Sequence, residues 1–230
     1  MARRSPRRSI GAVRSPEAHR SILAATAEIL GESGYAGFTI EAVARRAGAS
    51  KPTIYRWWKS KAALVMELYE EERETALSVS DLGSLEEELM IRMHNLWRLW
   101  QTTPLGHALR SIIAEAQIDA SALAQLCEDF LPKRRASTHT LFARAIARGE
   151  IPPDTDIEAA TTLIYSFNLY HLLTHQLDNE DVIDRYVRII VGGMKRGIRR
   201  TPVDRQKSVA NTPVAKISRQ PSRRAPTKRR

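Results

Sequence analysis

The stretch Phe38–Trp57, FTIEAVARRAGASKPTIYRW, decides the fold. Thr39 is a good N-cap for a first helix, whose apolar side chains recur at i, i+3, i+4 and i+7 on one helical face. Gly48 ends that helix, because glycine enters a left-handed turn at the lowest steric cost. Ser50 caps a second helix, where Pro52 is tolerated because first-turn amides have no intrahelical partner. The pattern predicts two short helices joined by a tight turn.

The second helix of this motif has a small apolar anchor and a polar outer face. Ile54 and Trp58 point inward at i and i+4. The outward side chains are polar or basic: Lys51, Thr53, Tyr55, Arg56 and Lys59. This geometry suits a helix that enters the major groove of DNA. The alternative is an ordinary helical hairpin in another all-α domain.

Two neighbouring features favour DNA binding. A long amphipathic helix precedes the motif, starting from a Ser15–Pro16–Glu17 cap, and completes a three-helix domain. Lys61 stands at the start of the following helix, from which a lysine can reach a phosphate beside the groove.

The segment from about Arg14 to Leu64 resembles the DNA-binding domain of the tetracycline-repressor (TetR) family of transcription regulators. Three groups of residues carry the resemblance: Gly34, Tyr35, Phe38 and Thr39; Ala44, Ala47, Gly48 and Ser50; Ile54, Tyr55, Trp58 and Lys61. The resemblance implies that the second helix contacts bases, and that Tyr55 and Lys61 contact phosphates. Trp57 departs from the family pattern, in which histidine or tyrosine is more usual, and this affects the expected base preference. The predicted DNA-contacting residues are Thr39, Lys51, Pro52, Thr53, Tyr55, Arg56 and Lys61.

Charge is distributed unevenly along the 230 residues, whose formal net charge is +10. Residues 1–14 hold five arginines and no acid, and residues 199–230 hold eleven Lys/Arg and one Asp. Residues 15–62 have seven basic and four acidic side chains, whereas residues 63–198 have 13 basic and 21 acidic side chains. An acidic body on a basic head fits a ligand-sensing domain attached to a DNA-reading one, although simple solvation of each domain fits as well.

Composition and periodicity predict an all-α chain in two domains between basic ends. The predicted divisions are a disordered basic arm (1–13), a helix-turn-helix domain (14–62, motif 38–57), a helical ligand-binding and dimerisation domain (63–199) and a disordered basic tail (200–230). The expected body helices span about 61–78, 84–100, 104–117, 121–148, 154–177 and 180–196, and Pro132 is expected to break or kink the fourth. The tails either add phosphate contacts or only solubilise the chain.

The last two helices have more apolar surface than one side of a small bundle needs. The TetR resemblance implies that they pair with the same helices of a second subunit, which would place two recognition helices about 34–36 Å apart on a palindromic site. A small-molecule pocket is expected in the body. Its candidate residues are His94, Trp97, Trp100, Tyr165, Phe167 and His171. The alternative is that these side chains fill the core.

Other chemistry is weakly supported. His171 and His175 share a helix face but lack a third ligand, so no metal site is predicted. There is no glycine-rich phosphate loop and no nucleophile elbow, so neither a cofactor nor an enzyme is predicted. Cys127 is expected to be a buried structural thiol, although a nucleophile or redox sensor is the alternative. Ala159–Leu177 is too polar to span a membrane, and a single cysteine fits a cytoplasmic protein.

These features together predict a homodimeric transcription repressor that binds double-stranded DNA and is released from a palindromic operator by a small-molecule effector. One alternative is an all-helical ligand carrier or enzyme whose basic ends serve solubility. Another is a nucleoid-type protein that binds DNA through its tails alone.

Overall fold

The computed structural model describes residues 15–197, which are helical and contain no β-strand. The elements in chain order are α1 (Pro16–Gly37), α2 (Ile40–Ala47), α3 (Lys51–Trp57), α4 (Lys61–Ala76), α5 (Leu85–Thr102), α6 (Leu105–Ile118), α7 (Ala120–Gln125), a π-helical turn η1 (Leu126–Phe130), α8 (Leu131–Ala147), α9 (Ile157–Leu173) and α10 (Asp181–Arg196). The predicted all-α fold is confirmed. The expected basic arm and tail lie outside the described residues.

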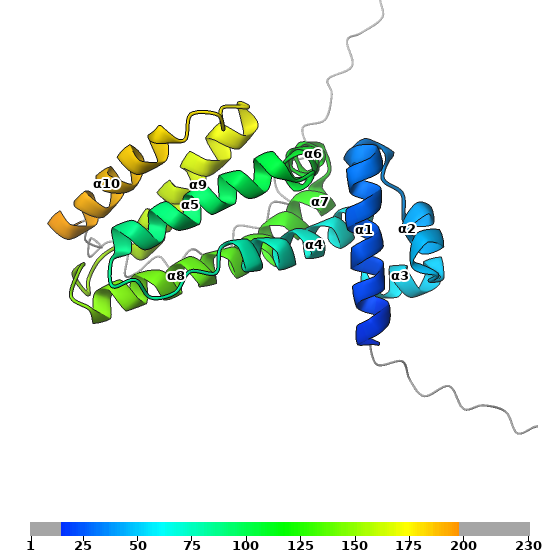
Figure 1. Ribbon diagram of the computed structural model, residues 1–230, viewed down its shortest axis with the longest axis horizontal. Coiled ribbons are helices and arrows are strands. Elements are labelled where there is room, and N and C mark those ends of the chain that lie inside the picture. Colours follow the sequence, from blue (N-terminus) through cyan, green and yellow to red (C-terminus); the bar gives the residue numbers. More distant parts are fainter. Residues whose placement is uncertain (1–14, 198–230) are drawn as a thin grey trace, which may run out of the picture.

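Helices α1, α2 and α3 form a small head at one end of the elongated molecule (Figure 1). Thr39 caps α2 by accepting a hydrogen bond from the backbone N–H of Ala42 at 3.2 Å. Gly48 follows α2 with a φ of 63°, in the left-handed region that favours glycine. Ser50 caps α3 by accepting from the backbone N–H of Thr53 at 3.3 Å. The predicted helix-turn-helix is therefore present, with the expected caps.

The buried side of α3 is anchored to the helices on either side of the motif. Ile54 and Trp58 are buried, as their spacing predicts. The indole N–H of Trp58 donates to Glu67 of α4. The same carboxylate lies 2.6 Å from the His19 ring of α1, and the His19 and Trp58 rings stack with centroids 5.4 Å apart. The orientation of α3 is therefore set by both α1 and α4.

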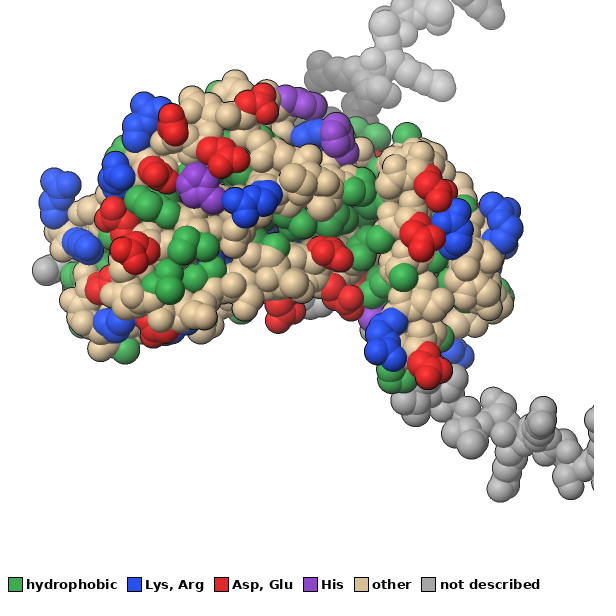
Figure 2. Space-filling view, in the orientation of Figure 1, with side chains coloured by type: hydrophobic (Ala, Val, Ile, Leu, Met, Phe, Trp, Pro, Cys, Tyr) green, Lys and Arg blue, Asp and Glu red, His purple; other side chains and the backbone are tan. Residues whose placement is uncertain are grey.

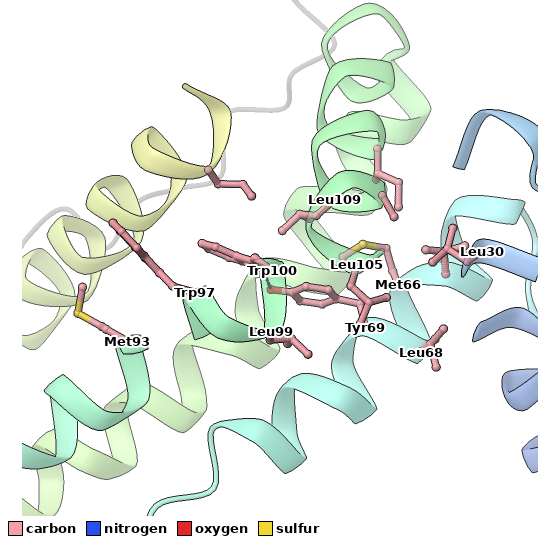
Figure 3. Packing of buried hydrophobic residues seen from close by; sticks show 14 of the residues in the cluster. Leu30, Met66, Leu68, Tyr69, Met93, Trp97, Leu99, Trp100, Leu105 and Leu109 are labelled. Carbon is pink, nitrogen blue, oxygen red and sulfur yellow. Dashed lines mark hydrogen bonds between the residues drawn. The ribbon is translucent and has the colours of Figure 1, made fainter. Parts of the chain in front are cut away.

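Helix α4 carries the chain from the head into the body through one continuous core. In Figure 3, Met66 of α4 lies beside Leu30 of the head, and Tyr69, one turn further on, lies beside Trp100 of α5. The Trp100 indole N–H donates to the Tyr69 hydroxyl at 3.1 Å. Helix α4 is therefore packed into the core of both the head and the body.

Helix α5 is the centre of the body and packs against α4, α6, α8 and α10 (Figure 1). Its fully buried Glu88 is compensated by two arginines of the α8 segment. Arg144 approaches within 2.7 Å and Arg148 within 3.2 Å. On the face shown in Figure 2, acidic and basic side chains are interspersed over head and body, and hydrophobic side chains are visible where the two meet.

The expected helix over residues 121–148 is interrupted just before Pro132. In η1 the N–H of Leu131 bonds to the carbonyl of Leu126, five residues back. The expected break or kink is therefore a π-helical turn, and the backbone stays right-handed helical on both sides of it. The turn lies just before Pro132, which has no N–H to donate to the helix. Cys127 lies on this turn and is exposed, so the expectation of a buried thiol is wrong. The reason is that neither α7 nor η1 contributes a buried side chain.

Helix α9 ends at Leu173, about one turn earlier than expected. His175 adopts a left-handed φ of 58°, and the N–H of Gln176 bonds back to the carbonyl of His171 at 2.9 Å. This backbone hydrogen bond closes the helix end, where the Thr174 hydroxyl also donates to the Tyr170 carbonyl at 2.7 Å. The apolar pattern continued to Leu177, which is buried beyond the helix, and it therefore overstated the helix length.

Candidate functional site

The exposed side of α3 presents the polar residues that the sequence pattern predicts. Tyr55 is 44% exposed, and Lys51, Pro52 and Arg56 are also exposed. Thr53 is half-buried, with its hydroxyl 2.8 Å from that of the capping Ser50. These side chains come from seven consecutive residues of one short helix. The arrangement offers hydroxyl, amine and guanidinium groups to a flat or grooved partner.

Neighbouring groups hold part of this surface in place. Lys51 donates to Glu41 of α2 at 2.7 Å, and this hydrogen bond raises the pKa of the lysine. The Arg56 guanidinium lies 5.8 Å from the centroid of the half-buried Trp57 ring. Thr39 is exposed at the start of α2. Because both side chains of the Lys51–Glu41 pair are exposed, its contribution to stability is small and a phosphate can compete for the lysine.

Lys61 lies at the boundary between head and body. Its ammonium is 3.5 Å from Glu115 of α6 and 4.3 Å from the ring centroid of Tyr35 in α1. The Tyr35 hydroxyl donates to the same glutamate at 2.8 Å, and burial together with this bond raises the tyrosine pKa. We call Tyr35, Lys61 and Glu115 the head–body tie, because they join α1, α4 and α6.

The body contains a cavity of about 340 Å³ bounded by α4, α5, α6, α8 and α9. Of the six residues predicted for a pocket, Trp100 and Tyr165 line it. Burial raises the pKa of Tyr165, which stays protonated as a hydrogen-bond donor at neutral pH. Most of the wall is aliphatic or aromatic, which is the usual character of a small-molecule site.

The other four predicted pocket residues lie outside this lining. Trp97 is fully buried and donates its indole N–H to Asn168 at 2.8 Å. Phe167 and His171 pack on Trp97, with ring centroids 5.9 and 5.0 Å away. His94 has its two ring nitrogens 3.2 and 2.9 Å from Glu180 and Asp184 of the α10 segment. Trp97 and Trp100 lie only about 60° apart around α5, but Trp97 packs against Asn168 and Phe167 of α9 whereas Trp100 donates to Tyr69 of α4 and lines the cavity.

Four arginines that the sequence reasoning did not select also line the cavity: Arg73, Arg92, Arg134 and Arg135. The sequence contained an indication that one of these arginines, Arg73, faces inward. Arg73 stands between Tyr69 and Leu77 at i+4 spacing, in a stripe that is otherwise apolar. A charged residue on the inward face of an amphipathic helix indicates a buried partner or a ligand.

Within the described residues, one group could hold a metal ion. His19, Glu67 and Glu71 bring ligand atoms within 4.8 Å of one another. Glu67 already accepts hydrogen bonds from His19 and Trp58, so these contacts account for the arrangement without an ion. The other histidine pair does not share a helix face, because α9 ends before His175.

The described helices include none that is long and apolar enough to cross a membrane. A capped three-helix head with a polar α3 surface, set on a helical body that encloses an apolar cavity, defines the class of helix-turn-helix DNA-binding regulators.

Comparison with known proteins identifies the family. Residues 22–68 match the model of the bacterial regulatory proteins of the tetR family, and residues 79–190 match a tetracyclin repressor-like C-terminal domain. An uncharacterised HTH-type transcriptional regulator of Bacillus subtilis, YdeS, is 32% identical over 83% of this chain and 94% of its own length. The protein therefore belongs to the tetR family and is a DNA-binding transcription regulator.

Two further relatives support this assignment. The HTH-type transcriptional repressor KstR of Mycolicibacterium smegmatis is 29% identical over 80% of this chain and 91% of its own. The solved tetR-family transcription regulator SCO0332 superimposes with a TM-score of 0.69 at 29% identity, covering 77% of this chain and 98% of the other. Both matches extend over head and body, so the likeness is not confined to the helix-turn-helix.

Proposed function

We propose that this regulator is a cytoplasmic repressor that binds a palindromic operator as a homodimer and releases it when a small molecule enters the 340 Å³ cavity. The observation that carries the DNA-binding part is the exposed polar face of α3 on a head whose caps and buried anchors fix the helix orientation. Recognition helices of this kind read base edges in the major groove while flanking groups contact phosphates.

Within α3 we assign separate roles to neighbouring residues. Thr53 and Arg56 are the base-reading candidates, since a guanidinium can bond two acceptors of guanine and a threonine offers a hydroxyl and a methyl group. Tyr55 and Lys51 are assigned to phosphates, as are Thr39 and the first-turn backbone beside Pro52. Lys61 reaches a phosphate only by leaving Glu115, which costs little because the pair is partly exposed.

Selection of bound sites from a random DNA pool tests these roles and gives the half-site spacing. Substituting Thr53 or Arg56 with alanine should change the selected bases, whereas Tyr55→Phe should weaken binding to all sequences about equally. An unchanged selected site in both Thr53→Ala and Arg56→Ala would refute the assignment. Deleting residues 1–13 and 201–230 should preserve sequence preference and reduce the salt dependence. Loss of all preference would instead favour binding through the tails.

The dimer is supported by apolar side chains left uncovered on the last two helices. On α9 these are Leu163, Leu169, Tyr170 and Leu173, and on α10 Ile189 is 71% exposed. Large apolar side chains clustered on adjacent helices favour a partner surface. A second copy of the same pair would form a four-helix interface with two-fold symmetry.

Light scattering on the full chain measures the oligomeric state. Ile189→Glu should convert the dimer to a monomer, because it places a charge at the proposed interface. Ile118→Glu is the matched control, since Ile118 is 90% exposed at the end of α6 and carries the same substitution. A wild-type protein that is monomeric at micromolar concentration would contradict the proposal.

Helix α4 connects the cavity directly to the head, because its residues line the cavity and also contact the DNA-binding domain. Tyr69 and Arg73 line the cavity, and Glu67 on the same helix contacts Trp58 at the end of α3. An effector that prefers one position of α4 would therefore change the placement of the two heads. The measurement is operator affinity with and without effector, and an effector that binds the body without altering that affinity would contradict this part.

A further inference from the structure

The cavity in the body contains more positive charge than the protein compensates. Three of its lining arginines, Arg73, Arg92 and Arg134, come from α4, α5 and α8, and none of the described lining residues is acidic. The carboxylate of Glu70, which is not part of the lining, accepts from Arg73 at 3.1 Å and from Arg134 at 2.6 Å. One carboxylate thus serves two guanidinium groups, and the third guanidinium has no carboxylate as a hydrogen-bond partner.

Arg134 offers the most direct evidence for a missing partner. Its side chain is 8% exposed, and its guanidinium lies 4.6 Å from the centroid of the Tyr69 ring. The Nε atom is bonded to Glu70, but the buried Nη2 has no hydrogen-bond partner. A buried donor of a charged group without a partner is costly, because it has lost its hydration and gained nothing in exchange. This donor belongs to a residue that lines the cavity.

Arg92 adds a second cation whose partners are neutral. It donates to the backbone carbonyl of Leu77 at 3.0 Å and to the Ser137 hydroxyl at 3.2 Å. Burial lowers the Arg92 pKa, and the charge of nearby Arg73 lowers it further. The Arg92 and Arg73 guanidinium groups therefore repel each other, and an anion bound beside Arg92 would relieve both this repulsion and the cost of burying Arg92 without a carboxylate partner.

The rest of the cavity favours an apolar partner. Leu89, Met93, Leu96, Trp100 and Leu109 contribute to its wall. At about 30 Å³ for each water-sized group, a volume of about 340 Å³ holds roughly ten non-hydrogen atoms. The cavity therefore combines a cationic end with an apolar chamber of medium size.

We propose that the effector is an amphipathic anion of about ten non-hydrogen atoms, with an apolar body and a carboxylate or phosphate head that binds Arg134 and Arg92. The inference rests on the proposed effector function of the cavity, and it adds the chemical class of the ligand. Arg73 completes the cationic end from α4, which links the head group to the helix that carries the DNA-binding domain.

Calorimetric titration of the full chain with four eight-carbon probes tests the class. Octanoate and octyl phosphate carry an anionic head, octanamide has nearly the shape of octanoate without its charge, and octylamine is cationic. At least one anion should bind about tenfold or more tightly than octanamide, because charge-assisted hydrogen bonds are stronger than neutral ones. Octylamine should not bind. Preference between the two anions distinguishes a carboxylate from a phosphate head group.

Four variants test where the anion binds. Arg134→Met and Arg92→Met should each weaken binding of the preferred anion about tenfold or more while leaving octanamide unchanged. Arg98→Met is the matched control, because Arg98 is exposed on the same helix as Arg92 and does not line the cavity. Arg134→Lys should restore part of the affinity and covers the case in which the methionine variant misfolds.

The proposal would be overturned if octanamide bound as tightly as both anions, or if Arg92→Met and Arg98→Met had equal affinities for the anion. Failure of both anions to bind would overturn it as well. Operator binding is measured separately. If the protein binds the anion selectively but stays bound to its operator, the effector function is contradicted and the ligand class still holds. If octanamide alone releases the operator, the effector function holds and the ligand class is contradicted.

Discussion

The head–body tie predicts how strongly the DNA-binding domain is held against the body. Glu115→Ala removes the hydrogen bond from Tyr35 at 2.8 Å and the ion pair with Lys61 at 3.5 Å. The hydrogen bond to a charged, partly exposed acceptor contributes about 1.5 kcal/mol, and the partly exposed ion pair about 0.5 kcal/mol. The variant should therefore lose about 2 kcal/mol of unfolding free energy. For a chain of this size the melting temperature should fall by about 4–8 °C.

Thermal unfolding followed by circular dichroism measures this loss. Glu72→Ala is the matched control, because Glu72 is exposed on α4 and its removal changes the net charge equally. A double-mutant cycle with Tyr35→Phe should give a coupling free energy of about 1 kcal/mol between Tyr35 and Glu115. A melting temperature within a degree of the Glu72→Ala control, or a coupling energy near zero, would refute the reasoning.

The same variant makes a functional prediction. With Glu115 removed, Lys61 no longer has to leave a carboxylate in order to reach a phosphate, so operator affinity should rise about twofold above that of Glu72→Ala. Equal affinities would show that Lys61 does not move between the two partners.

Three further perturbations follow from the described contacts. Glu88→Ala should cost about 3 kcal/mol in urea unfolding, because it leaves Arg144 without its buried carboxylate; a loss under 1 kcal/mol would contradict that account. Gly48→Ala should cost about 1 kcal/mol, since alanine is strained at a φ of 63°, and unchanged stability would argue against that turn. Partial desolvation and the adjacent Arg110 guanidinium lower the pKa of His107, so the stability contributed by its neutral form is present above the unfolded pKa of about 6.5 and is lost as pH falls below it. His107→Gln should flatten the stability profile between about pH 7 and 5, and an unchanged slope would refute it.

Local features of the head were predictable because each depends on a few consecutive residues. Thr39 and Ser50 cap helices through amides three residues away, and Gly48 meets a local steric demand. The periodicity that buries Ile54 is equally local. The family resemblance of this segment follows from the same residues, since they are the ones that form the helix-turn-helix.

The body was less predictable because its surroundings are assembled from distant segments. Trp97 and Trp100 look equivalent in sequence, yet only Trp100 lines the cavity. The helix end at Leu173 is set by a left-handed His175, which no apolar pattern indicates. Cys127 is exposed because a π-helical turn places it on the surface.

The sequence by itself determined the helix-turn-helix, its caps, the polar face of α3 and the helical class of the body, because helix periodicity and capping act over one or two turns. Only the tertiary structure decided that Arg73, Arg92 and Arg134 line the same cavity, and that Glu115 contacts both Tyr35 and Lys61. These groups are separated by up to 80 residues along the chain, and electrostatic interactions depend on distance in space.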